Sequence, residues 1–226
     1  MKLQSKGLPR LIALILAISL LPGCKQGEPA QKLVVLTFDD AVRSHLEYVA
    51  PLLKEKGFGA TFFVSNAWMN DTANFMQWDE VGELYRMGFE IGNHSWTHVP
   101  LHTDEAIAGM EENLARVESA LLAHGVPRPV SFGYPGNHFA PGAIEKVRTL
   151  GYQFARRGMQ PEIPYGKIAH GPLYDPEVNH ALLIPTTADA YPEWTVEYFK
   201  SIIERTENGK AIVLQFHGVP DVAHPW

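Results

Sequence analysis

Residues 33–40 read LVVLTFDD, an apolar run of β-branched and aromatic residues that ends in two adjacent carboxylates. A short apolar run of this kind predicts a strand buried on both faces, as in a parallel sheet. Carboxylates at the end of such a strand lie where α/β folds place their functional sites. We therefore interpret the run as the first strand of an α/β domain and treat Asp39 and Asp40 as candidate site residues. For the pair alone, a solvated turn that caps the next helix is the alternative.

The same alternation of short apolar runs and longer stretches of helical period continues along the 226-residue chain. It predicts βα units around a parallel sheet, which either closes into a barrel or opens into a doubly wound sheet. We expect strands at residues 33–38, 60–64, 89–92, 130–133, 152–155, 181–185 and 211–216. We expect helices at 43–56, 78–87, 104–124, 141–150 and 195–207, and a long loop at 158–180.

Composition excludes several classes of protein. A hydrophobic content of 46% is that of a globular chain, and the single cysteine cannot form a disulfide within the chain. The formal charge is −6 and no basic run follows the N-terminus, which argues against a nucleic-acid partner. The length fits one barrel-type α/β domain, a fold that routinely spans about 200 to 250 residues.

Residues 1–24 have the pattern of a bacterial lipoprotein signal. Basic residues precede an apolar run at 11–21, which is shorter than the roughly 20 residues that a helix needs to cross a bilayer. The sequence LPGC at 21–24 resembles a lipobox, with Cys24 as the acylated residue. We expect a lipoprotein anchored to the membrane of the bacterial cell envelope and facing the periplasm or the exterior. A plain secretory signal with a chance cysteine is the alternative.

The rest of the chain divides into a tether and one domain. Residues 25–31 are polar and contain glycine and proline, as expected of a tether, and residues 32–226 form the predicted domain. The sequence ends in the apolar run VPDVAHPW, soon after the last predicted strand. Because such a run is a poor natural terminus, we expect the sequence to be truncated there.

Two other predicted strands end in histidines. Residues 91–98 read IGNHSWTH, so His94 and His98 are four positions apart, and on a helical turn both rings would reach one metal ion. With one aspartate they make a 2-His-1-carboxylate set, which fits Zn²⁺ and leaves other divalent first-row metals open. The last strand delivers His217. Surface pairs and buried structural histidines are common, but a parallel sheet would bring these strand ends to one mouth.

These motifs resemble those of the polysaccharide deacetylases, the carbohydrate esterase family 4 enzymes with a NodB homology domain. The resemblance extends from Val35 to about His217. It implies a distorted (β/α)7 barrel, similar to a TIM barrel. It also implies a metal-dependent hydrolase that removes acetyl groups from a polysaccharide, with N-acetyl groups favoured over O-acetyl groups as the substrate. The implied roles are catalytic base for Asp39, metal ligands for Asp40, His94 and His98, catalytic acid for His217 and oxyanion-binding backbone N–H for Gly136.

The resemblance is incomplete in the middle of the chain. Gly133 stands where many members have an arginine that orients the base, and the family's fourth motif, which contains an aspartate, is not visible. We expect Arg156 or Arg157 to supply the missing positive charge near Asp39, with a solvated basic pair as the alternative. Tyr134 is a further auxiliary candidate. Sugar stacking is the alternative to a core or rim position for the large aromatic residues Trp68, Trp78, Trp96, Tyr165 and Trp194.

These departures leave two other functions open. One is a non-catalytic glycan-binding lipoprotein on the same barrel, which would have lost turnover with the missing motif residues. The other is a metal amidohydrolase that acts on small amides. The acidic composition does not exclude this activity.

Cys24→Ala tests the lipid anchor. If an acylated Cys24 holds the protein at the membrane, the variant should move to the soluble extracytoplasmic fraction, as measured by cell fractionation and immunoblotting. Retention of the variant in the membrane with an uncleaved signal would point to a plain signal anchor instead.

Overall fold

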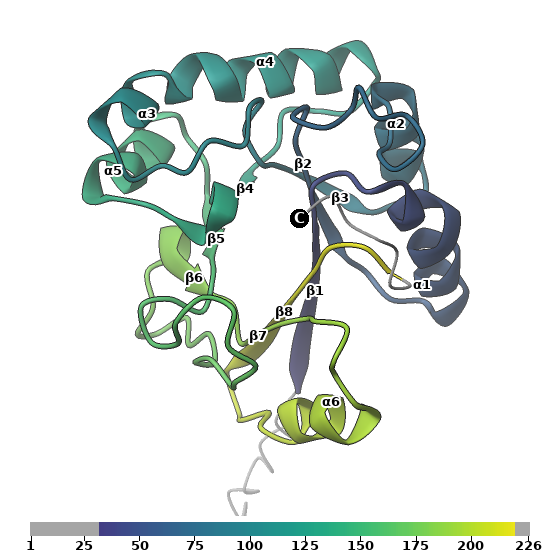
Figure 1. Cartoon of the computed structure of the whole chain (residues 1–226), viewed down its shortest axis with the longest axis vertical. Helices are drawn as coiled ribbons and strands as arrows, with labels where there is room; N and C mark the ends of the chain where they lie inside the picture. The colour runs from purple at the N-terminus through teal and green to yellow at the C-terminus, as the bar shows by residue number, and fades with distance from the viewer. Residues whose placement is uncertain (1–31, 220–226) are drawn as a thin grey trace, which may run out of the picture.

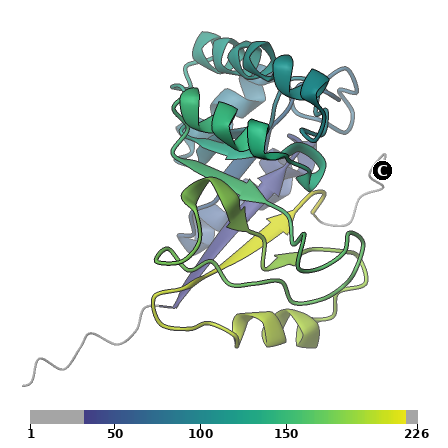
Figure 2. The same cartoon turned by 90° about the vertical axis from the view of Figure 1, so that its left-hand side faces the viewer.

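Parallel strands form one curled sheet in the computed structural model, which describes residues 32–219. The strands are β1 (Leu33–Asp39), β2 (Thr61–Val64), β3 (Glu90–Asn93), β4 (Ser131–Gly133), β5 (Phe154–Arg157), β6 (Ile184–Pro185), β7 (Ala188–Asp189) and β8 (Ala211–Phe216). Their order is β6-β5-β4-β3-β2-β1-β8-β7, which places the first and last strands of the chain side by side (Figures 1 and 2). The predicted α/β class with a distorted barrel is confirmed.

Helices surround the curled sheet on its outer side (Figure 1). They are α1 (Ala50–Lys56), α2 (Trp78–Arg86), α3 (Asp104–Ala108), α4 (Met110–Ala123), α5 (Pro141–Thr149) and α6 (Val196–Ile203). A π-helix, η1 (His45–Val49), precedes α1, and two 3₁₀ turns are η2 (Pro135–Asn137) and η3 (Ala181–Leu183). Among the described residues, no helix is long and apolar enough to span a bilayer.

Two of the expected helices are each divided in the structure. The helix expected at 43–56 consists of η1 followed by α1, and the helix expected at 104–124 consists of α3 and α4. Gly57 ends α1 in the left-handed conformation at φ 71°, which glycine adopts without steric cost.

The core fixes which side chains face the inside of the sheet. Phe38 of β1 points toward the helices, where its ring stacks on Phe62 of β2 and Phe216 of β8 with centroids 5.1 and 5.2 Å apart. Side chains alternate along a strand, so Thr37 and Asp39 face the opposite way. Packing of the three phenylalanine rings therefore also fixes the direction of Asp39.

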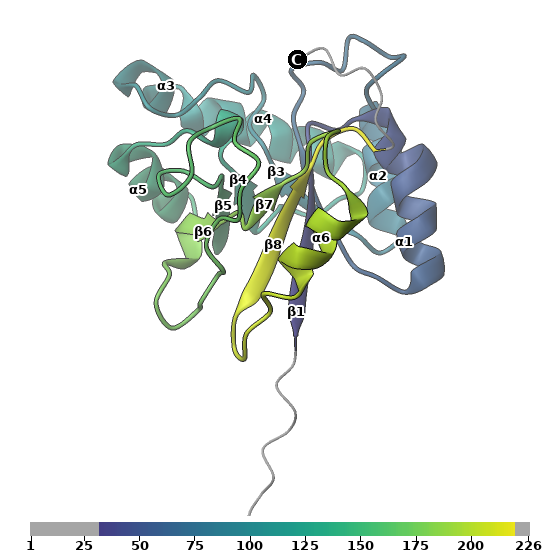
Figure 3. The same cartoon turned by 60° about the horizontal axis from the view of Figure 1, so that its bottom comes forward.

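The last third of the sheet differs from the sequence prediction. The expected strand at 181–185 is η3 followed by the two-residue strand β6, and another short strand, β7, follows at 188–189. Thr186 N donates to the Arg157 carbonyl at 3.1 Å, whereas Thr187 N donates to the Val213 carbonyl at 2.7 Å. Successive residues thus bind opposite edges of the sheet, which closes the curl at this point. Figure 3 shows β7 beside β8, with α6 packed against β8.

Candidate active site

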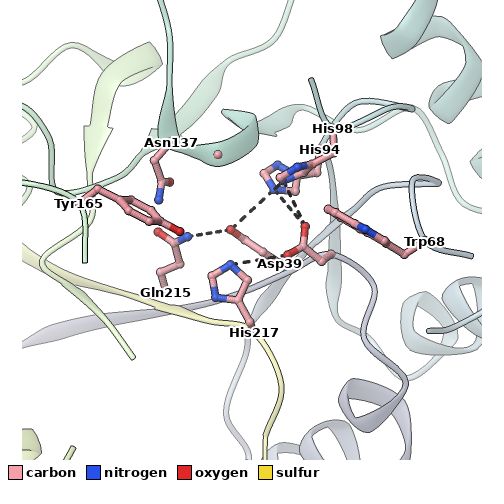
Figure 4. A pocket seen from close by; sticks show the side chains of 10 residues that line it. Asp39, Trp68, His94, His98, Asn137, Tyr165, Gln215 and His217 are labelled. Carbon is pink, nitrogen blue, oxygen red and sulfur yellow. Dashed lines mark hydrogen bonds and ion pairs between the residues drawn. The ribbon is translucent and has the colours of Figure 1, made fainter. Parts of the chain in front are cut away.

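A cavity of about 470 Å³ lies at the carboxyl ends of the strands (Figure 4). Its lining consists of Asp39, Asp40, Trp68, His94, His98, Gly136, Asn137, Tyr165, Gln215 and His217. All six residues to which the family resemblance gave a main role therefore line one cavity. They come from four different segments of the chain, so only the fold brings them together.

The turn after β1 directs both carboxylates into this cavity. Asp40 and the next residue, Ala41, have φ values of 76° and 58°, in the left-handed region that residues with a Cβ seldom adopt. The Asp40 N–H donates to the Phe63 carbonyl of β2 at 3.0 Å and holds this turn. Without the turn, the alternation of the strand would point Asp40 away from Asp39.

The two histidines of the IGNHSWTH motif do not lie on a helical turn, contrary to our expectation. They lie in an irregular loop after β3, in which Ser95 and His98 have φ values of 62° and 55°. Ser95 N donates to the Asn93 side-chain oxygen at 2.9 Å, and His98 N donates to Ser95 Oγ at 3.0 Å. From α4, Asn113 Oδ1 accepts a bond from the hydroxyl of Thr97 at 2.8 Å. These side-chain bonds stabilise a backbone that a regular helix could not provide.

Asp40, His94 and His98 form a cluster whose ligand atoms all lie within 4.8 Å of one another. The Nε2 atoms of the two rings are 3.1 Å apart, and Asp40 Oδ1 is 3.5 Å from one and 3.3 Å from the other. His94 Nδ1 donates to the Gly133 carbonyl at 2.7 Å, which leaves the lone pair of Nε2 facing the cluster. Among the described residues, neither carboxylate oxygen of Asp40 has a hydrogen-bond partner, although Asp40 is only 1% exposed.

The electrostatics of this cluster fit a divalent cation. Burial lowers the pKa of His94 to about 4 and the pKa of His98 to about 2, so both imidazoles are neutral at pH 7, the form in which they bind metal. Burial raises the pKa of Asp40 to about 7. A cation among these groups would offset the effect of burial, because it would stabilise the ionised form of the Asp40 carboxylate and lower its pKa.

Asp39 has a different set of partners. The Arg156 guanidinium donates to Asp39 Oδ2, and Gln215 Nε2 donates to the same oxygen at 3.0 Å. Arg156 in turn donates to the side-chain oxygens of Gln215 and Asn137 at 2.7 and 2.9 Å. Burial alone would raise the pKa of Asp39, but the guanidinium of Arg156, together with the nearby imidazoles of His94 and His217, outweighs burial and holds the pKa below its ordinary value. The other carboxylate oxygen, Oδ1, has no partner among the described residues.

The structure distinguishes between the three auxiliary candidates. Arg156 lies beside Asp39, whereas Arg157 points away and pairs with Glu162 at 2.8 Å. Tyr134 does not reach the cavity, because its ring is fully buried in the core and its hydroxyl donates to the Leu182 carbonyl at 3.0 Å. Neither Arg157 nor Tyr134 is therefore placed to act on the cavity.

Gly133 and Arg156 are neighbours across the β4·β5 ladder. A Cβ at position 133 would lie 2.9 Å from Nδ1 of His94, closer than real Cβ atoms come to a neighbour, and 3.2 Å from the Arg156 guanidinium, which is tighter than most real contacts. The glycine thus makes room for an arginine that enters from the adjacent strand.

His217 lies across the cavity from the two metal-site histidines (Figure 4). Its Nε2 is 3.6 Å from Asp40 Oδ2, and its Nδ1 is 3.9 Å from Oδ1 of Asp189. Burial raises the pKa of Asp189, which is 8% exposed at the end of β7. Sequence reasoning missed this carboxylate. The two-residue strand β7 is too short to show a sequence pattern. The only signal of a strand end was that Asp189 follows an apolar residue.

Two aromatic residues lie on opposite sides of the acidic and histidine cluster (Figure 4). The Trp68 ring packs against the His98 ring with centroids 4.7 Å apart. Tyr165 belongs to the long loop after β5 and is 64% exposed. The sequence left sugar stacking open for these two aromatic residues, whereas it gave no site role to Gln215 and Asn137, which also line the cavity.

Comparisons with known proteins identify the family to which the chain belongs. The family model described as polysaccharide deacetylase matches residues 26–155. A chitin deacetylase of Pestalotiopsis sp. is 33% identical over 88 residues, which cover 39% of this chain and 28% of that protein. The matched segments cover only 29% and 28% of the lengths of the two curated relatives.

Solved structures share the fold. The Streptococcus pyogenes deacetylase PplD, in complex with acetate, matches with a TM-score of 0.61 and 18% identity over 77% of this chain and 72% of its own. A pseudoenzyme of carbohydrate esterase family 4 from Bacillus anthracis matches with a TM-score of 0.57 and 19% identity over 83% of this chain and 56% of its own. With the family model matching more than half of its residues, the chain belongs to the polysaccharide deacetylase family.

Removal of one imidazole tests the metal cluster. His98→Ala should lose most of its bound divalent metal, because two ligands hold a cation far less tightly than three. Elemental analysis after dialysis against limiting Zn²⁺ measures the loss, with His102→Ala, an exposed histidine outside the cavity lining, as the control. Stoichiometric metal in both His98→Ala and His94→Ala would place the metal elsewhere.

Arg156→Ala and Arg157→Ala form a matched pair for the buried ion pair. Arg156→Ala leaves the Asp39 carboxylate buried without its cation and should cost about 3 to 5 kcal/mol of unfolding free energy at pH 7. Arg157→Ala should cost less, about 1 to 2 kcal/mol, because its partner Glu162 is half exposed and remains hydrated. Urea unfolding of the metal-free proteins measures both changes.

The same measurement as a function of pH checks the sign of the Asp39 contribution. The folded-state pKa of Asp39 is lowered, so the pair stabilises the wild type above the ordinary aspartate pKa, and this contribution is lost as pH falls through the folded-state value. Arg156→Ala should lack this decline. Equal losses of unfolding free energy in the two arginine variants would mean that the buried pair of Arg156 with Asp39 stabilises the fold no more than the half-exposed pair of Arg157 with Glu162.

Proposed function

We propose that this protein is a metal-dependent hydrolase that removes acetyl groups, N-acetyl in the first instance, from a glycan. The observation that carries the proposal is the division of labour between adjacent carboxylates: Asp40 faces two neutral imidazoles, whereas Asp39 faces a guanidinium and keeps one oxygen without a partner. Family membership supports the same reaction.

Asp40, His94 and His98 would hold the cation. One carboxylate and two imidazoles fit Zn²⁺ and leave coordination positions for water and substrate, as catalytic sites need, and other first-row divalent metals share these ligands. When bound, such a cation supplies Lewis-acid polarisation of water and of the acetyl carbonyl.

Asp39 is the proposed general base. Arg156 and Gln215 fix Oδ2, so Oδ1 is the acceptor available to take a proton from water as it attacks the acetyl carbon. Because the guanidinium lowers the pKa of Asp39, the carboxylate is ionised and ready to accept a proton at neutral pH.

His217 is the proposed general acid. It lies on the opposite side of the cavity from His94 and His98, where it can give a proton to the leaving amine nitrogen. The Asp189 carboxylate beside Nδ1 would orient the ring and stabilise its protonated form. The backbone N–H of Gly136 is the proposed donor to the oxyanion, supported by its position in the cavity wall.

The cavity walls support a sugar as the acetyl carrier. Trp68 and Tyr165 present aromatic surfaces on either side of the cluster, and sugar rings pack favourably on such surfaces through their C–H faces. An acetylated polysaccharide is therefore the substrate class we favour.

Two features argue for turnover over the non-catalytic alternative. That alternative rested on the missing arginine at position 133 and on the missing aspartate of the fourth motif. Arg156 and Asp189 supply a guanidinium beside Asp39 and a carboxylate beside His217, so neither group is without its charge partner. We favour a small-molecule amidohydrolase less, because of the exposed aromatic residue at the mouth of the cavity.

We also propose that the protein works at the bacterial cell envelope as a lipoprotein. The support is the sequence pattern alone: an apolar run at 11–21 that is followed by Cys24. These residues lie outside the described part of the chain.

Asp39→Asn tests the assigned mechanism. Loss of a positioned base should reduce the rate of acetate release from acetylated chito-oligosaccharides by about 10² to 10⁴-fold, while the metal content stays at the wild-type level. Asp79→Asn, at an exposed position on α2, is the matched control and should keep the wild-type rate.

Each alternative predicts a different result in this experiment. A binding module would release no acetate even as the metal-loaded wild type, over a panel of acetylated glycans, while still retaining those glycans on a column. An amidohydrolase for small substrates would cleave small acetamides faster than any oligosaccharide. Full activity of Asp39→Asn would refute the base even if deacetylation itself were found.

A further inference from the structure

A buried histidine that the mechanism does not use lies beneath the end of β8. His45 is the first residue of the π-helix η1 and is fully buried. Its ring packs against both Phe38 and Phe62, with centroid distances of 5.4 and 5.6 Å. Its Nε2 is 2.7 Å from the backbone carbonyl oxygen of His217, which is 172 positions away in the chain.

This contact takes over where the strand ladder stops. The paired register of β1 and β8 ends at Phe38 and Phe216, so the next carbonyl on the β8 side belongs to His217. A carbonyl oxygen only accepts, so Nε2 of His45 carries the proton and donates it. The His45 side chain therefore supplies a hydrogen bond to the first residue after β8, just beyond the last backbone pair of the two strands.

A second contact holds the same segment from the same turn. Ser44, the residue before His45, accepts a hydrogen bond at its Oγ from the Val219 backbone N–H at 3.2 Å. The π-helix that begins here is a rare element, and such elements are frequent at functional sites. Residues 44–45 thus bind the chain on both sides of residue 218.

We propose that His45 is a positioning residue for the general acid, holding the backbone of His217 so that its ring faces the leaving group. This inference rests on the proposed function, in which His217 is that acid. The regular pairing of β1 with β8 ends at Phe216, so the His45 bond fixes the backbone of the next residue, the one that carries the acid. A displacement of about 1 Å is enough to cost about 10²-fold in a reaction that depends on proton transfer.

The choice of substrate separates positioning of the acid from general damage to the site. An amine leaves poorly without a proton, whereas a phenolate leaves readily, so loss of the acid slows amide hydrolysis much more than aryl acetate hydrolysis. His45→Leu should therefore lower kcat for the N-acetylated oligosaccharide by about 10 to 100-fold, with aryl acetate hydrolysis, KM and metal content nearly unchanged. His217→Ala gives the upper limit of this change in the amide-to-ester ratio.

Conservative replacement and a matched control complete the design. His45→Gln keeps an N–H donor and should recover most of the amide activity. His124→Leu removes another histidine that binds a backbone carbonyl, that of Ala120 at 2.7 Å, but at the end of α4, and should keep the wild-type ratio. If His45→Leu does not fold, Ser44→Ala tests the same segment at a partly exposed position and should shift the ratio in the same direction.

A readout without turnover keeps the inference apart from the proposed function. In protein labelled with ¹⁵N-histidine, the ring signals of His217 should shift or broaden in His45→Leu and return in His45→Gln, whether or not the wild type releases acetate. Absence of acetate release with these changes would reject the proposed function alone. A folded His45→Leu with the wild-type amide-to-ester ratio and unchanged His217 signals, or with equal losses on both substrates, would overturn the positioning role.

Discussion

Two neighbouring carboxylates, Asp39 and Asp40, are each 1% exposed at the end of one strand. An ionised carboxylate without a partner costs several kcal/mol in a protein interior, and two adjacent ones repel each other as well. The surrounding fold resolves this by giving each its own positive or cation-binding environment. Arg156 enters from β5 for Asp39, and the loop after β3 brings two imidazoles to Asp40. The left-handed turn at residues 40–41 makes the arrangement possible because it points both side chains the same way.

The regular part of the fold and the main residues of the site were predictable because their signals are local. The first and last strands were expected at 33–38 and 211–216, and the structure has them at Leu33–Asp39 and Ala211–Phe216. Buried parallel strands are continuous apolar runs, so their ends are visible in the sequence, and polar residues at those ends converge once the sheet is parallel. That rule brings the segments of Asp40, His94 and His98 to one end of the sheet, and the left-handed turns within those segments direct the side chains toward one another.

Other parts of the site depend on information that no single segment carries. Arg156 and Arg157 are adjacent, and only the phase of β5 in the sheet decides which one faces the cavity. Asp189 follows a strand of two residues, too short for any periodicity to show. His45 lies within a helical pattern, and its contact with His217, just after β8, cannot be foreseen until β1 and β8 are paired. The irregular loop of His98 likewise depends on Asn113 of a later helix.

The direction of β1 also determines how the domain faces its surroundings. The strand begins at Leu33 and ends at Asp39 in the cavity, and seven residues of strand span about 20 Å. The chain therefore enters the domain at the amino ends of the strands, opposite the cavity. If a surface held the chain by its N-terminal side, the cavity would open away from that surface. The material in front of the cavity would then lie about one domain's depth from the surface. For a chain held in that way, the direction of β1 would favour a substrate at a distance from the surface over one that is part of it.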